Sequence, residues 1–215
     1  IASCDITNLP LIEYTASFKK PLILSTGMST LEEIDKAVEC ARNTGNKNIY
    51  ILHCVAEYPP RDERFNLRCI QLLQTRYSLP IGFSDHSTDD IATLAAVSLG
   101  ACIVEKHFTL SRNLPGVDHY FSMEPEKFSE MVEKVRRVEL MLGEEKKIVT
   151  KDEKEMQKSS RRGIKSTMKI KKGTVITKDM IAILRPQTGL PPEELSKILG
   201  KKDSVNIGEF VPIEK

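Results

Sequence analysis

The stretch from Ile81 to Thr109 constrains the fold of this chain most, because it has the pattern of a strand, a helix and a second strand. Residues 81–83 are a short apolar run, and Ser87 or Thr88 can cap the start of a helix. Apolar residues then recur at helical spacing, and residues 101–104 predict the second strand. Two strands joined by a crossover helix are parallel neighbours in a sheet.

Two histidines follow these two strands. His86 and His107 should lie at the carboxyl edge of the sheet, where parallel α/β folds carry their chemistry. Period two places Ser84 on the face of His86 and Glu105 on the face of His107. Two imidazoles near a carboxylate could hold a divalent metal ion with open coordination positions. The alternative is a pair of ordinary hydrogen-bonded histidines, and the spacing alone favours that alternative.

The strand–helix pattern repeats upstream of this unit. Residues 1–5 predict the end of a strand, and residues 21–24 and 48–54 predict two further strands, with helices after each of these two. Ser25 follows one strand beside a glycine, where hydroxyl and loop N–H groups could bind an anion. A simple turn residue at this position is equally compatible with the sequence. The order predicts a parallel sheet covered by helices.

Two of the expected helices have clear local signals. Ser29 or Thr30 can cap a helix that carries Glu32 and Glu33 at its start, which is a capping-box pattern. Residues 125–142 carry apolar side chains at helical spacing, and a glycine follows them.

Composition excludes several classes of function. The net charge is +2 and the basic run from Lys165 to Lys172 has no interleaved aromatic residue, which argues against nucleic-acid binding. No apolar run approaches the roughly 20 residues of a membrane span. Five scattered cysteines without a CxxC pair suit reduced thiols, so we expect a cytoplasmic protein.

The pattern changes after residue 143. Residues 144–160 are charged and lack apolar periodicity, which predicts a linker. From residue 161 onward, short β-prone runs predict a small β-rich module, with a hairpin turning at Lys172-Gly173. A short helix is expected to open at Pro191 and to close at Gly200.

Several ordered motifs carry a resemblance to a known family. GFSDHST, EKHFTL and PGVDHYFSMEP, together with LILSTGMSTLEEI and LHCVAEYP, closely resemble the sialic acid synthase family. The resemblance implies an α/β fold: residues 1–143 would supply strands 4–8 of a (β/α)8 TIM barrel. Residues 161–215 would form the antifreeze-like SAF domain, a β-clip. A long segment bearing the first barrel strands is expected upstream, so residues 1–215 alone should be aggregation-prone or partly molten, and inactive.

The resemblance also implies roles for individual residues. It makes His86 and His107 ligands of a divalent metal, usually Mn²⁺, with Mg²⁺ or Co²⁺ as alternatives. Glu105 and Asp118 become catalytic candidates, and Asp118 approaches the sugar hydroxyls. The implied substrate-binding residues are Ser3, Asp5, Ser25, Tyr58, Ser84, Asp118 and Arg185. Asp5 replaces a frequent glutamate of the family, and Cys4 replaces a common glycine.

The expected activity follows from the same resemblance. The family condenses phosphoenolpyruvate with N-acetylmannosamine or a related amino sugar, giving a nonulosonic acid and phosphate. Arg185 would reach across a domain-swapped homodimer. Val55 and Ala56 stand where some relatives place polar substrate-binding residues, so a 2,4-diacetamido sugar acceptor, for legionaminic or pseudaminic acid, is an alternative. An inactive sugar-binding fragment and a metal-dependent pyruvate aldolase are two further alternatives.

Overall fold

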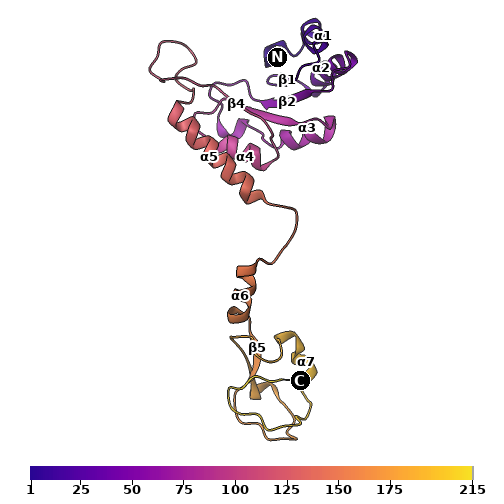
Figure 1. Ribbon diagram of the computed structural model, residues 1–215, viewed down its shortest axis with the longest axis vertical. Helices are drawn as coiled ribbons and strands as arrows, with labels where there is room; N and C mark the ends of the chain where they lie inside the picture. Colours follow the sequence, from indigo (N-terminus) through magenta and orange to yellow (C-terminus); the bar gives the residue numbers. More distant parts are fainter. Residues whose placement is uncertain (215) are drawn as a thin grey trace. The chain divides into compact units, whose positions relative to one another are not determined.

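The structure is a computed structural model that describes residues 1–214 and divides into two units, with the boundary between Glu144 and Glu145. The first unit alternates strands and helices, as Figure 1 traces. Its four strands form one sheet in chain order, and every neighbouring pair is parallel. The strands are β1 (Leu22–Ser25), β2 (Ile49–Cys54), β3 (Ile81–Asp85) and β4 (Val104–Lys106). The predicted strand–helix–strand repeat is therefore present.

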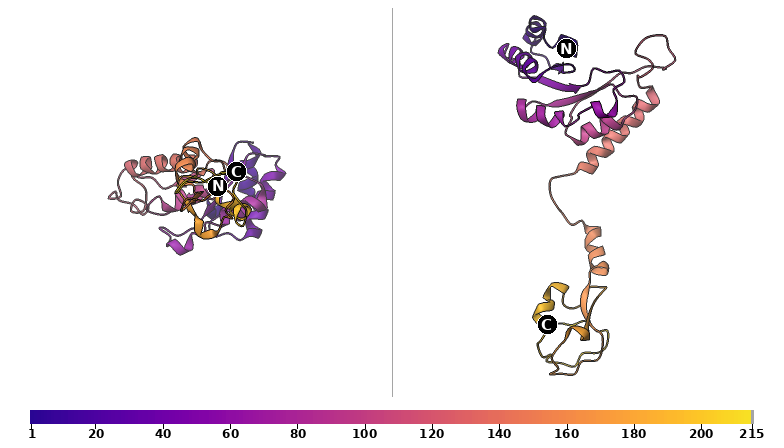
Figure 2. Two further views of the ribbon diagram at one scale, coloured as in Figure 1. Left: turned by 90° about the horizontal axis from the view of Figure 1, so that it is seen from below. Right: turned by 180° about the vertical axis from the view of Figure 1, so that it is seen from behind.

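One α-helix precedes the first strand, and the others follow the strands along the chain. The α-helices of this unit are α1 (Leu9–Ser17), α2 (Leu31–Asn43), α3 (Cys69–Tyr77), α4 (Ile91–Ser98) and α5 (Pro125–Leu142), with short 3-10 helices η1 (Ser3–Asp5) and η2 (Asp62–Arg64). Figure 1 and the right-hand view of Figure 2 show α5 running beside α4. The core lies between sheet and helices and contains Ile12, Leu24, Ile51, Ile70 and Phe83, all fully buried. This burial supplies most of the free energy that holds the sheet in place.

Helix ends in this unit follow the sequence closely, with one exception. Thr30 caps α2 in a capping box: its side chain accepts the N–H of Glu33, whose carboxylate accepts the N–H of Thr30. The expected cap of α4 at Ser87 or Thr88 is wrong. That helix begins later, at Ile91, because the side chain of Asp89 accepts the Ile91 N–H and holds the preceding residues in a turn.

The first residues also differ from the prediction. Residues 3–5 form η1 instead of the end of a strand. Ile1 nevertheless lies alongside β1, because its amino group donates to the Ile23 carbonyl and its own carbonyl accepts the Ser25 N–H. The strand-like contact thus ends after one residue, where the chain turns toward α1.

The second unit is small and β-rich. It contains α6 (Lys151–Ser160), β5 (Gly163–Ser166), η3 (Lys178–Met180), β6 (Ile181–Leu184), η4 (Pro192–Glu194) and α7 (Leu195–Ile198). Strands β5 and β6 are antiparallel. Among residues 145–214, seven buried apolar residues form the core of this unit: Ile164, Ile170, Ile176, Ile181, Leu190, Ile207 and Ile213. The predicted short helix after Pro191 is present, and Gly200 follows it with φ of +77°.

Residues 144–160 were expected to be a linker, and part of this segment forms the exposed helix α6, because Thr150 and Glu153 build a capping box. The predicted hairpin in the second unit is wrong. Lys172-Gly173 lies in a turn but not in a hairpin. The segments on either side pair with a distant stretch instead, as Ile170 bridges Ile207 and Val175 bridges Lys202. Across residues 1–214, no helix combines the length and the apolar character that a membrane crossing requires.

Candidate active site

Three polar side chains lie level with one another on three neighbouring strands. The register aligns Cys54 of β2 with Ser84 of β3 and Ser84 with Glu105 of β4. The Ser84 hydroxyl donates to a carboxylate oxygen of Glu105 at 2.8 Å. Cys54 and Ser84 are buried, whereas Glu105 reaches solvent. The predicted shared face of Ser84 and Glu105 is thus observed at the carboxyl edge of the sheet.

His86 is held in one orientation and one tautomer. Its Nδ1 lies 2.8 Å from the Val55 carbonyl oxygen, which can only accept, so Nδ1 carries the proton. Its Nε2 lies 3.3 Å from the Ser84 hydroxyl oxygen. Because Ser84 gives its single proton to Glu105, that proton is not available to Nε2. The Nε2 lone pair of His86 therefore remains available for another ligand.

The second histidine faces the first inside an aromatic frame. The ring centroids of His86 and His107 are 5.3 Å apart, with the rings nearly perpendicular. Tyr58 stacks on His86 at 4.1 Å and meets His107 edge-on at 5.8 Å. Buried Phe121 packs against His107 at 4.9 Å. These contacts limit the freedom of both imidazoles before any ligand arrives.

The loop after β4 returns to this group. Met123 donates its N–H to the His107 carbonyl at 2.8 Å, which brings residues 118–123 beside the histidine. Asp118 then lies with a carboxylate oxygen 4.0 Å from Nδ1 of His107, and its side chain is largely exposed. Tyr120 donates its hydroxyl to the Tyr58 carbonyl and so ties this loop to the one after β2.

Ser3 and Ser25 lie at the β1 side of the site. Ser25 ends β1 and is buried. A Cβ built on Gly27 would come within 3.1 Å of both the Ser3 hydroxyl oxygen and the Cys54 sulfur, so these three residues adjoin. Asp5 closes η1, and among the described residues no hydrogen bond joins it to the histidine group.

Arg185, the remaining predicted residue, is exposed at the end of β6 in the second unit, where its carbonyl accepts a hydrogen bond from Lys165 Nζ. Another histidine of the first unit, His53 in β2, lies on the opposite face of the sheet from Ser84: its Nε2 is 2.7 Å from the Phe65 carbonyl oxygen, and its ring stacks on Phe83. His53 is therefore a satisfied core residue.

Sequence reasoning missed a buried ion pair directly behind the histidines. Lys106 Nζ lies 3.0 Å from an Asp85 carboxylate oxygen, with side-chain exposures of 1% and 0%. The period-two pattern predicts that both side chains face away from the site, but it does not predict that they contact each other. It also missed Phe121, which lies within the motif PGVDHYFSMEP but was given no role.

The geometry fits a divalent ion at the two histidines. Burial lowers the pKa of His86, which keeps the imidazole neutral near pH 7, the form that binds metals. The hydrogen bond from Nδ1 to a backbone carbonyl is the usual outer-shell partner of a metal-bound histidine. Within residues 1–214, no three His, Cys, Asp or Glu side chains gather as a preformed metal cage. Such an ion would keep positions open for water or substrate.

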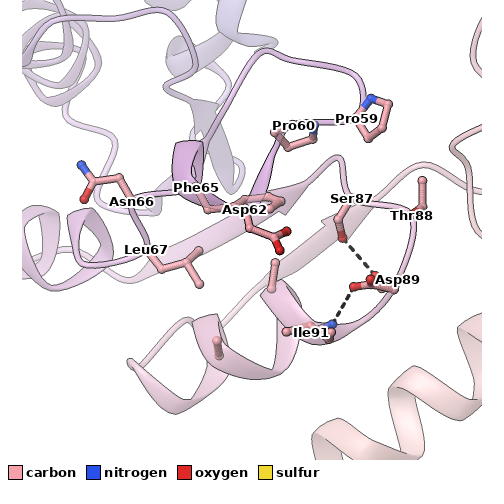
Figure 3. Close-up of a pocket in the computed structure, with 12 residues that line it drawn as sticks. Pro59, Pro60, Asp62, Phe65, Asn66, Leu67, Ser87, Thr88, Asp89 and Ile91 are labelled. Carbon is pink, nitrogen blue, oxygen red and sulfur yellow. Dashed lines mark hydrogen bonds between the residues drawn. The ribbon is translucent and has the colours of Figure 1, made fainter.

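A separate pocket of about 480 Å³ lies between the loops after β2 and β3. Figure 3 shows Asp62, Ser87 and Asp89 around it, with a hydrogen bond from the Ser87 hydroxyl to the Asp89 carbonyl. None of the predicted site residues lines this pocket. We therefore place the candidate active site at the histidines, where the chemistry-bearing side chains converge.

Fold and site together define a class: a parallel α/β half-barrel with a histidine pair at its carboxyl edge, followed by a β-rich module. The chain belongs to the NeuB family, whose profile matches residues 1–147, and a SAF domain profile matches residues 161–212. The resemblance to sialic acid synthases is thereby confirmed.

Individual relatives support the same assignment. The N,N'-diacetyllegionaminic acid synthase of Legionella pneumophila is 38% identical over 96% of this chain and 59% of its own length. The human N-acetylneuraminate-9-phosphate synthase is 34% identical over 97% of this chain and 58% of its own length. The chain thus spans about 60% of the curated relatives that it matches.

Solved structures support the fold. The Leptospira borgpetersenii sialic acid synthetase in complex with citrate aligns with a TM-score of 0.68 and 39% identity, over 73% of this chain and 54% of that one. A truncated 3-deoxy-D-arabino-heptulosonate 7-phosphate synthase from Thermotoga maritima aligns with a TM-score of 0.58 and 24% identity, over 66% of this chain and 58% of that one. The latter likeness concerns the fold alone.

The two buried histidines predict a stability that falls in mild acid. Burial lowers the pKa of His53 and of His86 below the value of about 6.5 for an unfolded histidine. A histidine whose pKa is lower in the folded than in the unfolded protein adds to the free energy of unfolding above about pH 6.5. This contribution is lost as the pH falls toward the folded-state pKa. Urea unfolding of the full-length protein should show a decreasing free energy from about pH 7 to 5.5.

His53→Gln supplies the matched variant for this prediction. A glutamine amide can still donate to the Phe65 carbonyl but does not titrate in this range. The pH dependence of the unfolding free energy should therefore be shallower in the variant. Equal slopes for wild type and variant would show that His53 does not contribute.

Proposed function

We propose that the full-length protein condenses phosphoenolpyruvate with an N-acetylated amino sugar, releasing phosphate and a nonulosonic acid. The observation that carries this proposal is the available Nε2 lone pair of His86, whose ring centroid lies 5.3 Å from that of His107 at the carboxyl edge of a NeuB-family sheet. The names of the relatives agree, since the similar proteins include legionaminic acid and N-acetylneuraminate-9-phosphate synthases. The four strands described here would belong to the later part of a TIM barrel, together with the strand-like start at Ile1.

His86 and His107 would hold the divalent ion, for which we propose Mn²⁺, with Mg²⁺ or Co²⁺ as alternatives. The bound ion supplies Lewis acidity toward the aldehyde oxygen of the acceptor sugar. The chain supplies the positioning: the Val55 carbonyl fixes His86, and Phe121 together with Tyr58 encloses His107. Neutral imidazoles with carboxylate and water oxygens suit a divalent first-row metal.

The remaining polar groups would bind the donor substrate, phosphoenolpyruvate. Attack of the phosphoenolpyruvate C3 on the aldehyde leaves positive character at C2, where water adds before phosphate departs. Ser3, Ser25 and the loop N–H groups beside Gly27 are the donors available for its phosphate and carboxylate. Glu105 would accept a proton; its exposure to solvent and the hydrogen bond that it accepts from Ser84 support this role.

The acceptor sugar is the finer part of the proposal. We favour N-acetylmannosamine or a related N-acetylated hexose, contacted by Tyr58 and Asp118, both exposed beside the histidines. Val55 and Ala56 are apolar and partly buried in the loop that carries Tyr58. A 2,4-diacetamido acceptor is the second candidate, favoured by the similarity to a diacetyllegionaminic acid synthase.

The test is a coupled phosphate assay on the full-length protein with Mn²⁺ and a panel of acceptors. Phosphate release that requires both phosphoenolpyruvate and one N-acetylated hexose, with mass-spectrometric detection of the keto acid, supports the synthase. Product formation from pyruvate would indicate an aldolase instead. Binding of sugar without phosphate release under any condition would indicate a sugar-binding protein.

We further propose that the enzyme works in the cytoplasm as a domain-swapped homodimer in which Arg185 reaches the partner's site. Arg185 is exposed and is not one of the residues that form the small unit's core. A planar guanidinium presents fixed donors to an amide carbonyl and sugar oxygens, which a lysine would not.

Tyr58 tests the acceptor site without disturbing the histidines. Tyr58→Phe keeps the ring that stacks on His86 and removes only the hydroxyl. If that hydroxyl binds the sugar, KM for the sugar should rise about tenfold, the equivalent of one hydrogen bond, with KM for phosphoenolpyruvate unchanged. Steady-state kinetics with each substrate varied gives both values. Equal KM values for the sugar in wild type and variant would show that the Tyr58 hydroxyl does not bind the sugar.

A further inference from the structure

Lys106 and Asp85 sit one residue before the two proposed metal ligands, on the outer face of adjacent strands. The register pairs their Cα positions directly. The inward neighbours of this pair are therefore His107 and His86, one step further along each strand. Contacts that hold Lys106 and Asp85 in place therefore also fix the spacing between His107 and His86.

Each charged group of the pair has several partners. Lys106 Nζ contacts Asp85 at 3.0 Å, the Ser87 carbonyl at 2.8 Å and the Ser87 hydroxyl at 3.1 Å. Asp85 also accepts the Ser87 N–H at 2.8 Å and the Thr93 hydroxyl at 2.6 Å. Both neighbours of His86 in the chain, Asp85 and Ser87, are therefore bound to Lys106, which precedes His107.

Such a buried pair is a poor way to add stability. Removing two charges from water costs free energy that their attraction offsets only when the geometry is excellent, and apolar replacements are often neutral or stabilising. Here the contacts all converge on the loop carrying His86, while α4 is attached through Thr93. This arrangement suits a role in fixing geometry.

We infer that Lys106 and Asp85 are positioning residues that set the relative placement of His86 and His107 for the divalent ion, an inference that rests on the proposed function. The two residues need not touch ion or substrate. Loss of a group that hydrogen-bonds a metal ligand typically lowers metal affinity about 10- to 100-fold, whereas Lys106 and Asp85 act through the backbone beside the two histidines. The same range is expected here.

The test compares Mn²⁺ affinity with stability in the full-length protein. The variant Asp85→Asn/Lys106→Met removes both charges together, and the introduced asparagine keeps an oxygen for the Ser87 N–H. Electron paramagnetic resonance of free Mn²⁺ gives the Kd, and urea unfolding gives the stability. We expect a Kd raised about 10- to 100-fold with the unfolding free energy largely retained. A crystal structure of the metal-free variant should show the two imidazoles moved from their 5.3 Å separation.

A second ion pair serves as the matched control. Arg76 and Asp35 bridge α3 and α2 away from the histidines, so Asp35→Asn/Arg76→Met should leave the Mn²⁺ affinity unchanged. Wild-type affinity in the variant that lacks the Asp85 and Lys106 charges would overturn the positioning role while the metal assignment stands. Equal Mn²⁺ binding by wild type and His86→Ala would overturn both.

A milder variant covers the case in which the double variant does not fold. Thr93→Val keeps the shape of the side chain and removes one hydrogen bond to Asp85. A weaker Mn²⁺ affinity at an unchanged unfolding midpoint supports the inference. If the double variant does not fold and Thr93→Val binds Mn²⁺ with wild-type affinity, the positioning role is overturned.

Discussion

Replacing His107 with alanine in the full-length protein is expected to abolish Mn²⁺-dependent turnover while the fold is retained. The imidazole is partly exposed, so its loss leaves no large cavity in the core. A bound Lewis acid contributes several kcal/mol of transition-state stabilisation, and a loss of that size lowers kcat about a thousandfold. Phosphate release at saturating phosphoenolpyruvate and sugar measures the effect, and circular dichroism checks the fold.

His53→Gln is the control for this experiment. It alters a buried histidine of the same sheet, but one whose ring faces Phe83 on the opposite side. Its turnover should match the wild type. Full activity in His107→Ala, with Mn²⁺ still required, would contradict the assignment of His107 as a ligand.

The second large effect concerns Arg185 and the proposed dimer. Arg185→Ala and His107→Ala should each be inactive as homodimers. If the SAF domain acts on the partner's barrel, a mixed dimer contains one site with both residues intact. By the symmetry of a two-fold pair, that dimer should recover up to about half of the normal activity.

The same mixture separates the two arrangements of the domain. If Arg185 serves the barrel of its own chain, every site in a mixed dimer retains one defect and mixing restores nothing. Subunit exchange must be shown first, for example with differently tagged chains. No recovery after demonstrated exchange would rule out domain swapping.

Local pattern was enough to predict the parallel sheet and the faces of its strands. The apolar runs before Ser84 and Glu105 and the period of two placed both residues on one side, and the structure joins them by a hydrogen bond. The capping box at Thr30 and the helix 125–142 were likewise predictable from neighbouring residues. The roles of the site residues rested on motif resemblance, and they remain proposals.

Features that depend on distant partners were not predictable in this way. The pairing of Ile170 with Ile207 replaces the expected hairpin, because register across the small unit is set by contacts between segments far apart in the chain. The Lys106–Asp85 pair required the alignment of β3 with β4, which period alone does not give. The capping box at Thr150 was a local signal, but the absence of apolar periodicity concealed the exposed helix α6.

The fate of the bridging oxygen of phosphoenolpyruvate tests the central claim most directly. The full-length protein would be incubated with Mn²⁺, an N-acetylated hexose and phosphoenolpyruvate carrying oxygen-18 between C2 and phosphorus. Addition of water at C2 followed by loss of phosphate predicts that the label appears in inorganic phosphate and the keto acid is unlabelled. Label retained in the sugar acid, or product formed without release of phosphate, would contradict a NeuB-type synthase reaction at the His86–His107 site.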